Sequence, residues 1–378
     1  MSEWRKVILS DIASFTTGKL NSNAAVENGK YPFFTCSPET LRIDNYAFEQ
    51  EAILLAGNNA EGNFNIKYYN GKFNAYQRTY VFTAKDNCVL RFLFYSLKLC
   101  LDNFKRISQG TATKFLTAKI LNSFELMLPN LKMQQQIASI LSAIDDKIEL
   151  NTAINENLEQ QAQALFKAWF VDFEPFGGVM PDDWAVTTLG TIAAISTKSI
   201  NPLKQPDLYL EHYSIPAYDE QHYPVFEYAS EVKSNKYILT NNSVMISKLN
   251  PDTKRIWRPL CLSANPVCST EFIVYEAVNP KYKDYIYSLI DSQAFSDYLC
   301  AHTTGSTNSR QRATPNATLD YTCIMPSDDI ITRFCGIVTP MYDQIASNII
   351  ESQRLAALRD TLLPKLMNGE IDVSAVKI

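Results

Sequence analysis

The feature that most constrains this fold is a long helical seam that occurs twice in the chain. Residues three and four positions apart line one face of an α-helix, so a heptad pattern of apolar residues predicts a helix that packs against a partner. The first seam consists of Ile137, Leu141, Ile144, Ile148, Asn151, Asn155, Leu158, Ala162 and Leu165. The second consists of Phe334, Val338, Met341, Ile345, Asn348, Ser352, Leu355, Arg359 and Leu362. Two polar residues interrupt each seam near its centre.

The polar centres indicate how the two helices pair. A helix of about 40 residues with a single apolar stripe needs a partner in water, and each helix can serve the other. In an antiparallel pair, Asn151 faces Ser352 and Asn155 faces Asn348, so every polar layer meets a polar layer. These four residues would then fix the register of the pair at some cost in stability.

The pattern alone does not decide the direction of the pair, because a parallel, in-register pair also matches polar with polar. The antiparallel arrangement is favoured because the segment between the helices can return the chain to the far end of the first helix. Its one misfit places Ile144 opposite Arg359.

The globular segments that precede the two helices also repeat. Trp4, Leu9, Ile12 and Ala13 recur as Trp184, Leu189, Ile192 and Ala193. Such a repeat indicates a duplicated domain, each copy followed by a helix. We expect an α+β protein with pseudo-two-fold symmetry, in which an antiparallel coiled coil separates two mixed α/β domains. The expected ranges are 1–130 (first domain), 131–174 (first helix), 175–327 (second domain), 328–370 (second helix) and 371–378 (tail).

Two local patterns carry further expectations. Residues 63–82 alternate apolar and polar side chains on both sides of Asn70-Gly71, which is typical of a β-hairpin. Aromatic residues gather at the end of the first helix, and they fit either a subunit interface or packing against the second domain. These residues are Phe166, Trp169, Phe170 and Phe173.

Composition narrows the class of protein. The chain has no run of about 18 apolar residues, as a membrane span would need, and its first residues lack a signal pattern. The eight cysteines are scattered without a C-x-x-C spacing, and the three histidines do not cluster with them. We therefore expect a cytoplasmic protein with reduced thiols and no metal site. The net charge of −5 argues against a general nucleic-acid coat protein.

Basic loops on this acidic chain can nevertheless bind DNA locally. The loops after Gly110 and Gly305 combine small hydroxyl side chains with lysine or arginine, which are groups that contact phosphates and base edges. The alternative is that both loops are solvated turns that join a helix to a strand. The candidate DNA contacts are Lys19, Asn58, Asn59, Tyr76, Gln77, Arg78, Thr111, Thr113, Lys114, Lys198, Lys248, Lys254, Arg255, Ser306, Thr307, Arg310 and Arg312.

Several motifs, in the same order in both halves, resemble a known family. The first half contains WRKVILSDIA, GTATKFLTAKIL, LPNLKMQQQIASILSAIDDKIELN and LFKAWFVDFEPF, and the second contains WAVTTLGTIA, GSTNSRQRATP and LRDTLLPKLMNGEIDV. Across the whole chain these motifs resemble the specificity subunit of type I restriction–modification systems. One departure is the start of the second helix, PSDDIITRFCGIV, where the Gln-Gln-Ile-Ala element of the first helix is replaced.

The resemblance implies that each domain is a target-recognition domain that reads one half of a split double-stranded DNA sequence. The two helices would set the spacing and dock two modification subunits, which methylate a flipped-out adenine. The chain itself would be non-catalytic and bind no cofactor. S-adenosylmethionine, ATP and Mg would belong to the modification subunits and to motor-nuclease restriction subunits.

The sequence agrees with an absence of catalysis, because it contains no Walker loop, no G-x-G-x-x-G and no Asn-Pro-Pro-aromatic run. Two alternatives remain open. One is a non-catalytic coiled-coil scaffold without DNA preference. The other is a stand-alone nuclease that uses Asp207, Glu231 and Lys233, although so loose a pattern arises readily by chance.

Overall fold

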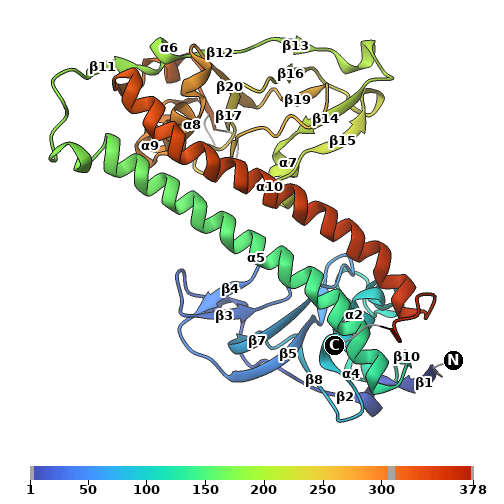
Figure 1. Cartoon of the computed structure of the whole chain (residues 1–378). Helices are drawn as coiled ribbons and strands as arrows, with labels where there is room; N and C mark the ends of the chain where they lie inside the picture. Colours follow the sequence, from blue (N-terminus) through green and yellow to red (C-terminus); the bar gives the residue numbers. More distant parts are fainter. Residues whose placement is uncertain (1–3, 305–310, 376–378) are drawn as a thin grey trace. The chain divides into compact units, whose positions relative to one another are not determined.

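The computed structural model describes residues 4–304 and 311–375, which form two compact units (Figure 1). The first unit contains the chain up to Ile148 together with the segment from Gln353 onward, and the second contains Glu149–Ser352. The two long helices, α5 (Leu131–Phe170) and α10 (Asp328–Met367), each run through both units. Each unit therefore consists of a mixed α/β domain and a part of both helices.

The first domain is built on a six-stranded sheet with the order β2-β8-β5-β7-β3-β4. Neighbouring strands are antiparallel except β3 and β7, which are parallel. Two further antiparallel pairs are β1-β10 and β6-β9. The strands are β1 (Arg5–Ile8), β2 (Ala13–Thr17), β3 (Tyr31–Phe34), β4 (Leu41–Ile43), β5 (Phe48–Ala56), β6 (Asn58–Asn59), β7 (Ile66–Ala75), β8 (Thr79–Ala84), β9 (Lys114–Phe115) and β10 (Glu125–Leu128). The helices are α1 (Leu9–Ile12), α2 (Leu90–Leu99), α3 (Leu101–Ile107), α4 (Ala118–Asn122) and the 3-10 turn η1 (Ser22–Ala24).

The hairpin expected at Asn70-Gly71 is wrong. Strand β7 runs straight through both residues and pairs with β5, with Gly71 opposite Gln50. The apolar positions change parity here because the sheet is covered on both faces. Ile66 packs into the core cluster that also contains α2 and α5 residues, whereas Phe73 packs into a separate cluster with Phe34 and Leu54. A change of buried face therefore produced the pattern that a turn would also produce.

The second domain contains a four-stranded sheet, β12-β20-β17-β18, and a five-stranded sheet, β13-β16-β19-β14-β15, together with the pairs β11-β23 and β21-β22. The strands are β11 (Ala185–Thr188), β12 (Ala193–Ile195), β13 (Ser199–Ile200), β14 (Tyr209–Tyr213), β15 (Val225–Tyr228), β16 (Lys236–Ile238), β17 (Ser243–Ser247), β18 (Ile256–Trp257), β19 (Pro266–Ser269), β20 (Phe272–Ala277), β21 (Thr303–Thr304), β22 (Arg312–Ala313) and β23 (Thr322–Met325). The α-helices are α6 (Leu189–Ile192), α7 (Ile215–Gln221), α8 (Lys283–Asp291) and α9 (Gln293–Ala301). The 3-10 turns are η2 (Glu174–Phe176), η3 (Pro202–Lys204), η4 (Ala229–Glu231), η5 (Pro280–Tyr282) and η7 (Asn316–Asp320).

The repeat in the sequence corresponds to a repeat of elements. The antiparallel pair β1-β10 corresponds to β11-β23, and the strand order β2-β8-β5 corresponds to β12-β20-β17. The short helices α1 and α6 follow the first strand of each pair and bury the repeated leucine and isoleucine. Leu9 and Leu189 are both fully buried. The repeated residues are therefore core positions of one domain plan that occurs twice.

In the second unit the polar residues of the two seams meet. Asn151 is fully buried, and its side-chain amide donates hydrogen bonds to Ser352 Oγ at 3.2 Å and to Glu351 Oε2 at 2.8 Å. The amide of Asn348 donates to Asn155 Oδ1 at 2.8 Å. Asn151 contacts residue 352 and Asn155 contacts residue 348, so the residue number on α10 decreases as that on α5 increases. The two helices are therefore antiparallel in this unit. The expected α+β class and antiparallel helix pair are confirmed.

Arg359, the expected misfit of the helix pair, forms an ion pair in the first unit. Arg359 Nη1 contacts Asp145 Oδ1 at 2.7 Å, so the guanidinium pairs with the residue after Ile144. Asp145 also accepts a hydrogen bond from the Tyr95 hydroxyl of α2 at 2.7 Å. The side chains of Arg359 and Asp145 are only 18% and 22% exposed. A partly buried ion pair thus connects α2, α5 and α10 in this unit.

The aromatic residues at the end of α5 pack against the second domain. Phe166 and Phe170 are buried in a cluster that contains Trp184 and Phe334. The Phe170 ring lies 4.9 Å from that of Phe334 and 5.9 Å from that of Trp184. Of the two roles left open for these aromatics, the structure supports packing within the unit. Within the described part of the chain, no helix is long and apolar enough to span a membrane.

Candidate DNA interface

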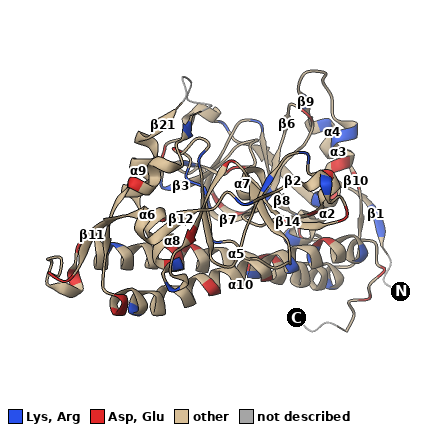
Figure 2. Ribbon diagram, turned by 90° about the horizontal axis from the view of Figure 1, so that it is seen from above, with Lys and Arg blue, Asp and Glu red and all other residues tan. Residues whose placement is uncertain are grey.

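The first candidate site is a small β-bridge that joins two loops of the first domain. Strand β6 pairs with β9, so that Asn59 lies opposite Lys114 and Asn58 opposite Phe115. Asn59 Oδ1 accepts hydrogen bonds from the backbone N–H groups of Glu61 and Asn63, each at 2.9 Å. Asn59 therefore shapes the turn that follows it. Figure 2 shows β6 and β9 on the side of this unit away from α5 and α10.

The glycine of the neighbouring loop is required by its backbone. Gly110 has a φ of +103°, and a Cβ atom at this position would lie 2.0 Å from the Thr113 carbonyl oxygen. The loop, which carries Thr111, closes because Gln109 and Phe115 exchange backbone hydrogen bonds of 3.0 and 2.7 Å. This closure places Thr111 and Thr113 at the tip and Lys114 at its base, beside β6.

The turn of Tyr76, Gln77 and Arg78 lies beside the same bridge. The Arg78 guanidinium lies over the Phe115 ring, 5.3 Å from its centroid, and the Gly57 N–H donates to the Arg78 carbonyl at 2.8 Å. The Gln77 N–H donates to the Leu20 carbonyl at 2.9 Å, which brings the exposed Lys19 segment to the turn. The structure thus gathers the first-domain candidates, which are spread over residues 19–114 of the sequence, around β6 and β9.

Basic side chains gather close to this bridge. The side chains of Lys105 and Lys114 both approach Gly62, at 3.1 and 3.3 Å from the position a Cβ atom would occupy. Lys105 Nζ donates to Asn63 Oδ1 at 2.7 Å. Figure 2 shows further basic positions on the adjacent α3 and α4. This corner combines lysines, amides and hydroxyls, which are the groups that contact phosphates and base edges.

The second domain repeats this arrangement. Leu249 forms a bridge with Arg312, and the Asn250 N–H donates to the Gln311 carbonyl at 2.9 Å. The Asn250 carbonyl accepts from the Thr253 N–H at 2.9 Å, just as the Asn59 carbonyl accepts from the Gly62 N–H at 3.4 Å. Asn250 is therefore the structural counterpart of Asn59. It was missed in the sequence, although aligning the segments AGNN (56–59) and SKLN (247–250) after the two matching strands would have found it.

Each of the two segments also contains one buried side-chain acceptor, although the two do not occupy matching positions, because Asn58 corresponds to Leu249. Among the described residues, Oδ1 of Asn58 and Oδ1 of Asn250 are buried and have no hydrogen-bond donor. A buried polar atom without a partner is costly. Asn87, His212, Asn242 and Trp257 each have such an atom too, so this feature by itself does not mark the site. Asn58 directly precedes Asn59, and Asn250 is itself the residue that pairs with Gln311.

Three cations proposed as DNA contacts in the second domain are paired with carboxylates. Lys254 Nζ lies 2.5 Å from Asp291 Oδ1, and Arg255 contacts Asp219 through two hydrogen bonds of 2.6 and 2.9 Å. Arg312 contacts Glu271 at 2.9 and 3.3 Å, and this carboxylate raises the pKa of the guanidinium. The scarcity of acids in the local sequence, where Asp252 alone lies near Lys254 and Arg255, was misleading because the carboxylate partners come from distant segments.

The remaining second-domain candidates differ in position. Lys248 is half-buried at the end of β17, where its carbonyl accepts from the Ala313 N–H at 2.9 Å, so it belongs to the same bridge as Asn250. Lys198 is exposed in the loop before β13. Ser306, Thr307 and Arg310 lie outside the described residues. The described residues contain no group of three or more His, Cys, Asp or Glu side chains that could hold a metal ion.

The fold and the site together define a chain with two copies of one domain, each carrying a loop pair suited to nucleic acid and each joined to the same antiparallel helix pair. Part of the chain also matches a known protein family. Residues 1–160 match the family model of the type I restriction modification DNA specificity domain.

Similarity to individual proteins extends further. The chain is 36% identical over 163 residues to the EcoDI specificity subunit of Escherichia coli, a match that covers 42% of this chain and 35% of that protein. It is 26% identical to the HindI specificity subunit of Haemophilus influenzae, over 98% of this chain and 100% of that protein. The fold is similar to that of an S subunit of M. genitalium, with a TM-score of 0.65 at 16% identity and coverage of 97% and 96%. Residues 1–160 thus match a type I restriction modification DNA specificity domain, and over nearly its whole length the chain is similar to a type I specificity subunit.

Proposed function

We propose that this chain reads a bipartite sequence of double-stranded DNA, with each domain contacting one half. The observation that carries the proposal is the repeated bridge, in which an asparagine-led turn pairs with the strand that follows the glycine loop. Asn59 with Lys114 forms it in the first domain, and Asn250 with the segment before Arg312 forms it in the second. Two similar readers on one chain suit two half-sites on one duplex.

The proposal assigns different tasks to different side chains. Lysines such as Lys114 and Lys248 would contact phosphates, which supply affinity without sequence information. Asparagine, glutamine and threonine side chains in the turns would contact base edges, because an amide can donate to and accept from one base. Gln77 in the first domain is an exposed amide suited to this role. Asn59 and Asn250 would contribute through their Nδ2 groups, because Asn59 Oδ1 already accepts two backbone hydrogen bonds and Asn250 Oδ1 is buried.

We further propose that the chain catalyses no reaction itself. Two modification subunits would dock on α5 and α10 and bring S-adenosylmethionine for the methylation of adenine. Motor-nuclease subunits would bring ATP and Mg. The polar layer of Asn151, Asn155, Asn348 and Ser352 supports this arrangement, because a fixed register of the helix pair would fix the spacing of the two half-sites.

The test is to co-express the chain with the modification subunit encoded beside it and to map N6-methyladenine in the host DNA. The expected result is a motif of two defined parts with a constant unspecified gap. Replacing residues 1–130 with the corresponding domain of another specificity subunit should change one part only. An assembled complex that produces no such motif would contradict the proposal.

A further inference from the structure

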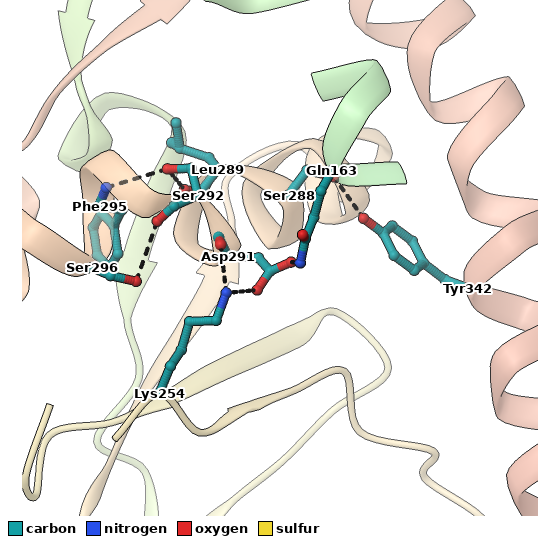
Figure 3. A network of polar contacts seen from close by, with 9 residues as sticks. All are labelled: Gln163, Lys254, Ser288, Leu289, Asp291, Ser292, Phe295, Ser296 and Tyr342. Atoms are coloured by element: carbon teal, nitrogen blue, oxygen red, sulfur yellow. Dashed lines mark hydrogen bonds and ion pairs between the residues drawn. The ribbon is translucent and has the colours of Figure 1, made fainter. Parts of the chain in front are cut away.

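The loop between β17 and β18 carries three of the second-domain candidates, Lys248, Lys254 and Arg255, and an ion pair holds its far end. Lys254 Nζ contacts Asp291 twice, at 2.5 Å to the carboxylate and 2.8 Å to the backbone carbonyl (Figure 3). Asp291 is the last residue of α8, so the ammonium also lies at a helix C-terminus, where a positive charge is favoured. The Asp291 side chain is 10% exposed. A carboxylate this deeply buried needs a cation as its partner.

The same carboxylate connects the loop to the long helices. Its second oxygen, Oδ2, accepts a hydrogen bond of 2.7 Å from Gln163 Nε2 of α5. One turn earlier on α8, the Ser288 hydroxyl lies 2.9 Å from the Tyr342 hydroxyl of α10. Figure 3 shows Lys254 and Gln163 reaching Asp291 from different elements. Asp291 therefore links the loop, α8 and the helix pair of this unit.

Asp291 also lies at the junction of α8 and α9, and α9 leads to β21 of the candidate site. Ser292 follows it and caps α9 by accepting from the Phe295 N–H at 3.2 Å. Helix α9 leads directly into β21, which pairs with β22. Strand β22 contains Arg312, the partner of Leu249. The Asp291 side chain thus holds the Asn250 loop through Lys254, and the segment that leads through α9 to β21 begins at the next residue.

The first domain has no acidic side chain at the position that corresponds to Asp291. In the repeat, Tyr95-Ser96-Leu97 corresponds to Tyr287-Ser288-Leu289, which places Leu99 at the position of Asp291. The Leu99 side chain is 41% exposed. A role of Asp291 in recognition would therefore concern only the half-site that the second domain reads.

We propose that Lys254 and Asp291 are positioning residues, which hold the Asn250 turn in its DNA-reading geometry by bracing it against α8 and α5. This inference rests on the proposed function and reassigns Lys254 from phosphate contact to a structural partner of Asp291. Two of the three ammonium donors of Lys254 are already used by Asp291.

The experiment compares Lys254→Met, Lys254→Arg and Asp291→Asn with the control Lys248→Met, which lies in the same loop. Each chain is assembled with its modification subunit. Binding is measured to a duplex with both half-sites and to one in which the second half-site is scrambled, over a range of salt concentrations. The wild-type complex must first discriminate between the duplexes, and its failure to do so would reject the proposed function rather than this inference.

Lys254→Met and Asp291→Asn should each weaken binding to the full site by about tenfold, the size of the loss of one base contact, and leave binding to the scrambled duplex unchanged. In both variants the slope of log K against log salt should equal that of the wild-type complex. Lys248→Met should weaken binding to both duplexes and reduce the slope by about 1. Lys254→Arg should keep the ion pair and therefore the discrimination.

Two results would overturn the inference. A slope that falls by about 1 in Lys254→Met, as in Lys248→Met, would mean that Lys254 contacts a phosphate. Unchanged discrimination in both Lys254→Met and Asp291→Asn would mean that the brace does not position the turn. The double variant Lys254→Met with Asp291→Asn separates coupling from general damage, because a working pair predicts a loss no larger than that of either single change.

Discussion

At the scale of single residues, the protein depends on polar side chains that are buried and satisfied by partners distant in sequence. Gln134, at the start of α5, is 1% exposed, accepts from the Val89 N–H at 2.9 Å and donates to the Pro129 carbonyl at 2.9 Å. The matching position of α10 is Ile331, which is fully buried in the apolar core of the second unit. At the position directly before the Gln-Gln-Ile-Ala element, the second helix thus replaces a hydrogen-bonded contact by an apolar one.

The buried Asn151 should be important for stability. Asn151→Ala removes the hydrogen bonds to Ser352 and Glu351 and leaves buried groups unpaired, so we expect a loss of about 1–3 kcal/mol in the free energy of unfolding. Urea unfolding measures this loss. Asn157→Ala, six positions further along α5 on an exposed face, should change the stability by less than about 0.5 kcal/mol. Equal effects of the two changes would contradict a special role for the central layer.

His212 should make the second unit sensitive to acid. Burial lowers the pKa of His212 below its usual 6.5, and this effect outweighs the hydrogen bond of 2.6 Å with Glu227, which raises it. At a pH below 6.5 the unfolded chain binds a proton that the folded chain does not, so stability present above this pH is lost as the pH falls.

The measurement is the unfolding midpoint of the full chain between pH 7.5 and 5. His212→Gln should make the loss between pH 7 and 5 smaller, because its side chain cannot titrate. His302→Gln, at an exposed position, should leave the profile as in the wild type. A wild-type profile in the His212 variant would show that other groups cause the acid sensitivity.

At the scale of elements, two glycines show how backbone conformation limits which residue a position can hold. Gly110→Ala must shift the loop, because of its φ of +103° and the contact of 2.0 Å with the Thr113 carbonyl. We expect a cost of about 1–3 kcal/mol, confined to the loop, and loss of the first half of the methylated motif. Retention of the complete motif in this variant would remove the loop from the interface.

Gly336 in α10 is the matched case in which alanine should help. Its φ is helical and no atom lies within 4 Å of a Cβ atom built there. Gly336→Ala should raise the free energy of unfolding by about 0.5–1 kcal/mol, because alanine loses less backbone entropy in a helix. Thermal unfolding measures the gain, and a lower midpoint would indicate that this face of α10 is not free in the folded chain.

At the scale of the whole molecule, the two domains should act on one duplex at the same time. The chain has a net charge of −5, so its affinity for DNA must come from local cations. Lys114→Met and Lys248→Met, one in each domain, should each reduce the slope of log K against log salt by about 1, and together by about 2. Binding is measured with the assembled complex on a full-site duplex. A double variant that loses no more slope than either single variant would show that only one domain is engaged.

Much of the fold was predictable because it follows from local periodicity. The two seams predicted the long helices, and matching of polar layers predicted the contacts of Asn151 with Ser352 and of Asn155 with Asn348. The duplication predicted two domains of one plan. The hairpin at Asn70-Gly71 failed because periodicity cannot distinguish a turn from a strand whose buried face changes.

The candidate site was less predictable because it consists of contacts between distant segments. The sequence indicated basic loops with few acids or none, but Lys254, Arg255 and Arg312 each contact a carboxylate that lies 36 to 41 positions away in the sequence. The ion-pair partner of Arg359 lies on the other long helix, one position beyond the layer expected to face it. Whether a basic side chain is neutralised depends on which carboxylates lie near it in the folded structure. The neighbouring residues in the sequence do not show this.

What the sequence alone determined was the repeat, the class of fold, the pairing of the polar layers of the two helices and the resemblance to a family. These depend on periodic burial, which is encoded residue by residue. Only the tertiary structure decided which polar groups share a site. It brought Asn250 into correspondence with Asn59, joined Lys254 to Asp291 and Gln163, and placed the aromatic end of α5 in the core of the second unit. Those contacts depend on how sheets and loops close over long separations, where one side chain meets another only after the chain has folded.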